Sequence, residues 1–129
     1  MRPNDVSYRV IGAALKVHTA LGAGVLESAY DTCLCQELSV VGLQFHHQVT
    51  LPVVCHGETL PRSYKVDFVV ERCLVVEIEC VSSVLPIHRA QLLSYLRLTG
   101  RKLGLLLNFN VLHLKDGIHR IINGPESEL

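Results

Sequence analysis

A chain of 129 residues is long enough for one hydrophobic core, and we expect a single domain over residues 1–129. Apolar residues make up 49% of the chain and charged residues 19%, which excludes a disordered, charge-rich protein. The formal net charge is zero, and this argues against a dedicated non-specific nucleic-acid binder but leaves room for an enzyme with a local basic patch.

The N-terminal segment has the pattern of an amphipathic helix. Asn4 or Asp5 can cap its start, and Gly22 is a plausible stop. Apolar residues recur between them in steps of three and four. They are Val6, Val10, Ala13, Ala14, Val17 and Leu21. We therefore expect the first helix to lie against the core along this stripe.

A second helix is predicted from Val25 to about Val40, with Gly42 ending it. Its apolar face is formed by Leu26, Ala29, Tyr30, Cys33, Leu34 and Leu38. Glu27 precedes Tyr30 by three residues, so its carboxylate points along this apolar stripe. An acid at a helix start also complements the helix dipole, and that ordinary role remains an alternative.

The central segment is rich in β-formers and indicates three strands. The first is expected near 44–55, where Pro52 suggests an edge strand or a bulge. A turn at 56–58 leads to a second strand near 60–70. The third strand is "LVVEIEC", residues 74–80.

The last part of the chain predicts one helix and two strands. The helix covers 86–99, with Ser82 or Ser83 as a cap, Pro86 in its first turn and Gly100 as its stop.

The apolar run "KLGLLLNFN" suits a buried strand, and "GIHRIIN" a short final strand. We expect residues 123–129 to be a frayed tail. The order α-α-β-β-β-α-β-β indicates an α/β (α+β) domain, with a mixed sheet covered by helices.

Carboxylates in the middle of two apolar strands are the most unusual feature. Strand alternation assigns Lys65, Asp67 and Val69 to one face of the second strand, and Tyr64, Val66, Phe68 and Val70 to the other. In the third strand, the same rule groups Val75 with Glu77 and Glu79. A two-residue turn at 71–72 would pair Asp67 with Val76, whereas a three-residue turn at 71–73 pairs it with Glu77. We expect the odd-numbered turn.

Carboxylates that meet in an apolar sheet cannot all remain ionised without a cation. Mg²⁺ prefers oxygen ligands, and a metal-activated water can attack a phosphodiester. The alternative is internal pairing, with Asp67 beside Lys65 or an arginine and Glu79 at an exposed strand end.

Helix 86–99 carries His88, Gln91 and Tyr95 on one face. Gln91 and Tyr95 can hydrogen-bond a phosphate or orient a water, although an ordinary polar stripe explains them equally well. His46 and His47 are expected to point to opposite faces of a strand, which argues against a shared metal.

The cysteines and the N-terminus bear on localisation. The five cysteines are odd in number and none forms a C-x-x-C pair, which is typical of reduced thiols in a cytoplasmic protein. The N-terminal "MRPNDVSYRV" has no apolar signal region, and no apolar run approaches the ~20 residues of a membrane span. We expect no membrane association.

Three ordered blocks resemble the GxxExxY proteins, a family in the PD-(D/E)XK nuclease superfamily. The motif itself reads Gly24-Val25-Leu26-Glu27-Ser28-Ala29-Tyr30. "LPVVCHGETLPRSYKVDFVVERCLVVEIE" resembles the central hairpins, and "HRAQLLSYLRLTGRKLGLLLNFN" the closing block. The similarity covers roughly residues 5–123.

The resemblance implies an αβββαβ core with an extra N-terminal helix. It implies that Glu27, Asp67 and Glu77 bind Mg²⁺ or Mn²⁺. It also implies that Gln91 and Tyr95 match a Q-x-x-x-Y feature of RecB-like nucleases.

Glu79 departs from the family pattern, because it stands where the family has a lysine. Such a lysine would position the attacking water and neutralise developing charge. Three outcomes are open. Glu79 can serve as a general base or an extra ligand; Lys65, Arg101 or Lys102 can supply the cation; or catalysis is lost.

Three functions therefore compete. The first is a Mg²⁺- or Mn²⁺-dependent nuclease that acts on DNA or RNA. The second is a catalytically inactive nuclease fold that serves as a binding module, whose partner would be a second copy of the chain or another protein. The third is a structural protein whose acids pair internally.

Overall fold

The computed structural model describes residues 1–59 and 64–129. Its helices and strands are, in chain order, α1 (Pro3–Leu21), α2 (Glu27–Val40), β1 (Phe45–Leu51), β2 (Val54–Cys55), β3 (Glu58–Thr59), β4 (Tyr64–Val70), β5 (Leu74–Glu79), α3 (Pro86–Thr99), β6 (Leu103–Asn108) and β7 (Ile118–Ile122). Two short 3₁₀ helices, η1 (Leu114–Gly117) and η2 (Glu126–Glu128), flank β7. The expected mixed α+β architecture is confirmed.

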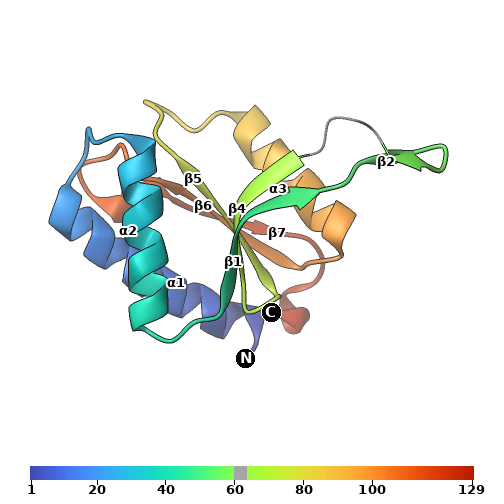
Figure 1. Ribbon diagram of the computed structural model, residues 1–129, viewed down its shortest axis with the longest axis horizontal. Helices are drawn as coiled ribbons and strands as arrows, with labels where there is room; N and C mark the ends of the chain where they lie inside the picture. The colour runs from blue at the N-terminus through green and yellow to red at the C-terminus, as the bar shows by residue number, and fades with distance from the viewer. Residues whose placement is uncertain (60–63) are drawn as a thin grey trace.

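Five strands form one sheet in the order β1-β4-β5-β6-β7 (Figure 1). Strands β5 and β6 run parallel, and the other neighbours are antiparallel. A parallel pair needs a long crossover, and α3 supplies it. All six residues of β6 are buried, as the continuous apolar run predicted.

Helices cover both faces of the sheet (Figure 1). On one face, α1 and α2 bury a first core that includes Val10, Leu34, Phe68 and Phe109. On the other face, α3 buries a smaller second core that includes Leu92. The sheet is therefore the middle layer of three, and residues that alternate along a strand enter different cores.

The first predicted strand is shorter than expected. It ends at Leu51, directly before Pro52, which has no N–H to donate to a ladder. Strands β2 and β3 then form a separate two-stranded ribbon, which projects from the body of the molecule (Figure 1). Its two-residue turn, His56-Gly57, has φ values of 51° and 77°, a left-handed conformation suited to tight hairpins. Residues 60–63 of the second predicted strand lie outside the described residues, and β4 is described from Tyr64.

Helix starts differ from the predicted caps. Helix α1 begins at Pro3, so Asn4 and Asp5 lie inside its first turn. Proline is favoured at a first helical position because the N–H that it lacks would be unpaired there. Helix α3 likewise begins at Pro86, not after Ser82 or Ser83; the ring nitrogen Nδ1 of His88 accepts the Leu85 N–H at 2.9 Å.

The three helices end at the predicted glycines. Gly22 and Gly100 follow α1 and α3 with φ values of 72° and 69°, and Gly42 has a φ of 78° just after α2. These positive values suit a residue without a Cβ.

The C-terminal residues are ordered against α1, so the predicted frayed tail is wrong. Leu129 is 1% exposed and belongs to the first core. Its carbonyl accepts the Asn4 N–H at 3.0 Å, and the Arg2 guanidinium donates to the Ser127 carbonyl at 3.0 Å. The apolar final side chain and these two bonds hold the segment in place. Within the described residues, no helix combines the length and apolar character that crossing a membrane requires.

Candidate metal centre

The β4–β5 hairpin has the predicted odd-numbered turn. Three residues, 71–73, separate the strands, and Val70 pairs with Leu74, Val69 with Val75, and Phe68 with Val76. Continued by one residue, this register sets Asp67 opposite Glu77. Glu71 and Arg72 adopt φ values of 49° and 60°, which allow the chain to reverse within three residues.

Side chains replace the backbone ladder at this position. The Asp67 N–H donates to Glu77 Oε1 at 2.7 Å, and the Ile78 N–H donates to Asp67 Oδ2 at 2.7 Å. On the other side of β4, the β1 ladder skips Gln48, whose φ is 56°. The amide Nε2 of Gln48 lies 3.4 Å from Asp67 Oδ1. The sheet therefore opens around Asp67, and both acids are held by main-chain donors.

This opening corrects the predicted alternation of β4. Val66 packs with Val69 in the second core, whereas Phe68 and Val70 lie in the first core. Residues 66 and 68 were expected to share a face. They do not, because the ladder on which strict alternation depends is interrupted at Asp67. Tyr64 agrees with the corrected pattern, since its ring lies 5.0 Å from that of Tyr95 on α3.

The carboxylates raise one another's pKa values. Burial is the largest cause for Glu77, Asp67 adds to it, and together they raise the pKa of Glu77 to about 8. The pKa of Glu27 is raised by burial and then by Asp67, Glu79 and Asp31.

The pKa of Asp67 is also raised by burial, although the Ile78 N–H opposes this. Burial raises the pKa of Glu79, and His88 opposes it. The four acids thus share one electrostatic environment in which full ionisation is unfavourable.

Internal pairing of the acids is not observed among residues 1–59 and 64–129. Ion pairs there join His47 to Asp31 and Lys102 to Glu128. Lys65 is exposed and forms no ion pair with Asp67 in that part of the chain. Asp67 and Glu77 accept main-chain hydrogen bonds, but within the described residues none of the four acids has a basic side chain within 4.0 Å.

Arg101 and Lys102 cannot substitute for the missing lysine. Glu79 pairs with Asn108 at one end of β6, whereas these two residues precede Leu103 at the other end. Five strand steps correspond to roughly 16 Å. Arg101 Nε donates instead to the Arg72 carbonyl at 3.1 Å, and Lys102 Nζ lies 3.3 Å from Glu128. The expectation that Arg101 or Lys102 supplies the cation beside Glu79 is therefore wrong.

A cavity of ≈ 350 Å³ gives access to part of this cluster. It lies between α2 and the opened part of the sheet and is lined by Glu27, Ser28, Asp31, Thr32, Gln48 and Asp67. Glu27 begins α2 and lines this cavity together with Asp67 of β4. Glu77 lies deeper and does not line this cavity.

The two predicted α3 residues differ in their surroundings. Tyr95 is 7% exposed, and burial together with Glu77 raises its pKa to about 12. Gln91 is exposed on the same helix. Tyr95 therefore lies within the field of the acids, whereas Gln91 faces solvent one turn earlier.

Asp31 and Gln48 lie in the site although neither was expected there. The i, i+4 spacing of Glu27 and Asp31 was a visible signal, because it places two acids on one helix face. Gln48 gave no signal, since its role depends on a left-handed backbone inside a strand. His46 and His47 were expected not to share a metal with each other; the Nε2 atom of His47 lies instead 2.5 Å from Asp31 Oδ1.

The donor set fits a hard divalent cation. Asp67 Oδ1 and the second oxygen of Glu77 remain free of main-chain bonds within the described residues. Carboxylate oxygens are the ligands that Mg²⁺ and Mn²⁺ prefer, and a cation would relieve the mutual repulsion that raises the pKa values.

Comparison with known proteins agrees with this geometry. A family model described as the PD-(D/E)XK nuclease superfamily matches residues 4–121. Neither the curated proteins nor the solved structures gave a match. The family match spans both helical layers and the five-stranded sheet except for its last residue, Ile122. The chain belongs to the PD-(D/E)XK nuclease superfamily.

Proposed function

We propose that this protein is a Mg²⁺- or Mn²⁺-dependent nuclease of the GxxExxY type, which hydrolyses phosphodiester bonds in DNA or RNA. The observation that carries the proposal is the convergence of Glu27, Asp67, Glu77 and Glu79. Burial raises the pKa of each, neighbouring carboxylates add to the rise, and no basic side chain pairs with them among the described residues. Such a cluster is costly to build without a cation.

In this proposal, Glu27, Asp67 and Glu77 hold the ion. A divalent ion bound there would stabilise negative charge on a phosphate and supply an activated water. The main-chain bonds from Asp67 and Ile78 fix the two strand carboxylates before any ion arrives. Tyr95 and Gln91 would contact the nucleic acid from α3, and exposed Lys65 would attract its backbone.

Glu79 takes the place of the family lysine and is given the role of a proton acceptor or an additional ligand. Burial raises the pKa of Glu79, which makes its carboxylate a stronger proton acceptor than an exposed glutamate. His88 is the charge that most opposes this rise, so α3 tunes the same group.

A catalytically inactive nuclease fold is the second candidate, and Glu79 is the observation that favours it. Without a cation at that position, developing negative charge would be less well stabilised. The protein would then bind nucleic acid, a second copy or another protein without hydrolysing a substrate.

Isothermal titration of Mn²⁺ into metal-free protein tests the centre. The wild type is compared with Asp67→Asn, which removes the charge but keeps an oxygen that can accept the Ile78 N–H. Asp116→Asn is the matched control, since Asp116 is exposed in η1, outside the cluster. We expect binding in the wild type and the control, and loss of binding in Asp67→Asn.

Hydrolysis of single- and double-stranded DNA and RNA in Mn²⁺ then separates the two candidates. Cleavage by the wild type that Asp67→Asn abolishes supports the nuclease. Metal binding without cleavage of any substrate favours the inactive module. Absence of Mn²⁺ binding in the wild type contradicts the metal centre itself.

A further inference from the structure

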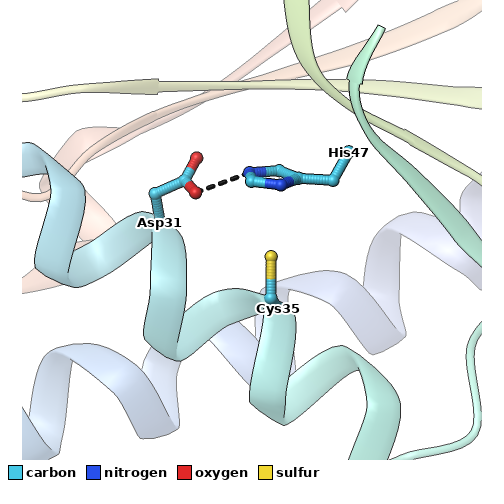
Figure 2. Close-up of side chains that lie close together, drawn as sticks. All are labelled: Asp31, Cys35 and His47. Atoms are coloured by element: carbon cyan, nitrogen blue, oxygen red, sulfur yellow. Dashed lines mark hydrogen bonds and ion pairs between the residues drawn. The ribbon is translucent and has the colours of Figure 1, made fainter.

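A second cluster of metal-ligating side chains lies beside the acidic centre. Asp31 and Cys35 are one turn apart on α2, and His47 reaches them from β1. One ligand atom from each residue lies within 4.8 Å of those from the other two. Figure 2 shows the Cys35 sulfur and the His47 ring directed toward the space beside the Asp31 carboxylate.

The neighbourhood orients these groups. The His47 ring centroid lies 4.8 Å from that of Phe68, and its Nε2 atom lies 2.5 Å from Asp31 Oδ1 on α2. The Gln48 amide lies 3.4 Å from both Asp31 Oδ2 and His47 Nε2. The side chains of His47 and Asp31 are 36% and 16% exposed, which leaves a route from solvent.

We propose that Asp31, Cys35 and His47 form a site for a zinc-type ion, distinct in ligand chemistry from the all-carboxylate centre. A thiolate and an imidazole select borderline or soft ions such as Zn²⁺ and Co²⁺, whereas Mg²⁺ and Mn²⁺ prefer oxygen. Three protein ligands leave one tetrahedral position for water or another ligand. The i, i+4 pair on a helix with a third ligand from a strand gives a compact arrangement.

Ion binding requires a small movement of the ligands and the loss of the Cys35 thiol proton. Ligands about 2.0–2.3 Å from one tetrahedral ion lie roughly 3.3–3.7 Å apart, so the His47 and Asp31 ligand atoms must separate from 2.5 Å. The exposed His47 side chain allows this movement. Burial and Asp31 raise the pKa of the Cys35 thiol, so binding breaks its S–H bond, forms a sulfur–metal bond and releases the proton to solvent.

Cobalt is the probe, because a cobalt–thiolate bond produces a charge-transfer absorption that oxygen and nitrogen ligands do not. Co²⁺ is added to chelator-stripped full-length protein in excess Mg²⁺, and the near-ultraviolet spectrum is followed. We expect a saturable charge-transfer band that Zn²⁺ removes. Cys35→Ser should abolish the band, and His47→Ala should weaken Co²⁺ binding by at least ~10-fold.

Neighbouring residues supply matched controls. Cys55→Ser alters an exposed thiol on β2, and His46→Ala alters the adjacent histidine, which shows no contact with Asp31 in the described residues. Both should retain the band and the wild-type affinity. Asp67→Asn should also retain it, which separates this site from the acidic centre.

Several outcomes would overturn the assignment. They are no charge-transfer band in the wild type, a band that survives in Cys35→Ser, and equal weakening by His46→Ala and His47→Ala. Circular dichroism of each variant establishes that it is folded. His47 is on the surface, so His47→Ala remains decisive even if Cys35→Ser disturbs the packing of α2.

Discussion

Asp67 and Glu77 are each anchored by the strand that carries the other. The main-chain N–H of Asp67 donates to the Glu77 carboxylate, and the N–H of Ile78, next to Glu77, donates to the Asp67 carboxylate, both at 2.7 Å. Two acids that repel each other are thereby fixed side by side within a sheet. Their geometry does not depend on a bound ion, although their ionisation does.

The ionisation of Glu77 should make stability depend on pH. The folded-state pKa of about 8 lies above the ordinary value of 4.5, so the folded protein binds a proton more tightly than the unfolded chain. The stabilisation of the folded state by protonated Glu77 is therefore fully present below about pH 4.5 and is lost as the pH rises to about 8. The free energy of unfolding falls by up to ~5 kcal/mol over this range. Thermal unfolding of metal-free protein across this range should show a falling Tm.

Glu77→Gln provides the control for this dependence. Glutamine keeps a side-chain oxygen for the Asp67 N–H but cannot ionise. The variant should be more stable than the wild type at about pH 8 and similar to it at about pH 4.5. An unchanged slope of Tm against pH in Glu77→Gln would assign the effect to other groups.

Truncation of the Asp67 side chain should lower the free energy of unfolding, whereas removal of its charge alone should not. Asp67→Ala leaves the Ile78 N–H without its acceptor, at a cost of about 1–3 kcal/mol. Asp67→Asn keeps an acceptor and lowers repulsion among the acids. Urea unfolding should rank the alanine variant below the asparagine variant. The opposite ranking would mean that the carboxylate charge, not its hydrogen bond, supports the fold.

Glu79→Lys should restore the acid-x-lysine pattern of the family. A cation in place of Glu79 removes one source of the raised pKa values of Glu27 and Glu77, so both should ionise at lower pH. If the chain hydrolyses phosphodiesters, we expect faster cleavage in Mn²⁺ by about 10-fold or more. Glu79→Gln controls for simple loss of the acid. If Glu79→Lys and Glu79→Gln both cleave more slowly than the wild type and to the same extent, Glu79 itself takes part in the reaction.

Tyr95 allows its hydroxyl and its ring to be tested separately. The ring is buried against Tyr64 and the second core, so Tyr95→Ala should lower stability by about 3–5 kcal/mol. Tyr95→Phe keeps the ring and should leave Tm nearly unchanged. A loss of cleavage or nucleic-acid binding in the phenylalanine variant alone would give the hydroxyl a role at the substrate. Unchanged activity would restrict Tyr95 to packing.

Leu129 should be as important to stability as a residue in the middle of a strand. It is 1% exposed, and Leu129→Ala should cost about 2–5 kcal/mol. Leu112→Ala is the control, because Leu112 is 86% exposed and its truncation should change stability by at most ~0.5 kcal/mol. Urea unfolding of both variants measures the difference. Equal stabilities would show that the C-terminal segment is not held in solution.

The sequence was informative where local rules and register decide the structure. Helical periodicity predicted α1 and α2, the glycine stops were correct, and counting residues in the 71–73 turn placed Asp67 opposite Glu77. These features depend on short stretches of chain and on the fixed geometry of an antiparallel pair. Counting residues decided the pairing of the acids only once the turn length was known, because the sequence left a two-residue turn open.

Features that depend on tertiary contacts were not predictable in this way. The β4 alternation changes at Asp67 because side chains replace the ladder there, and no local pattern encodes that substitution. The pairing of Asp31 with His47 joins residues on two elements, and it depends on how α2 lies over β1. The C-terminal segment is held because Leu129 joins the first core and its carbonyl accepts the Asn4 N–H, contacts between residues far apart in the chain.

The main-chain donors at the acidic centre also provide built-in spectroscopic reporters. The amide proton of Asp67 is bonded to the Glu77 carboxylate, and that of Ile78 to the Asp67 carboxylate. The NMR chemical shift of each amide therefore senses the charge on one particular acid. A titration of the labelled protein would resolve the two ionisations separately, and addition of Mn²⁺ would broaden the same two signals first if the ion enters between them.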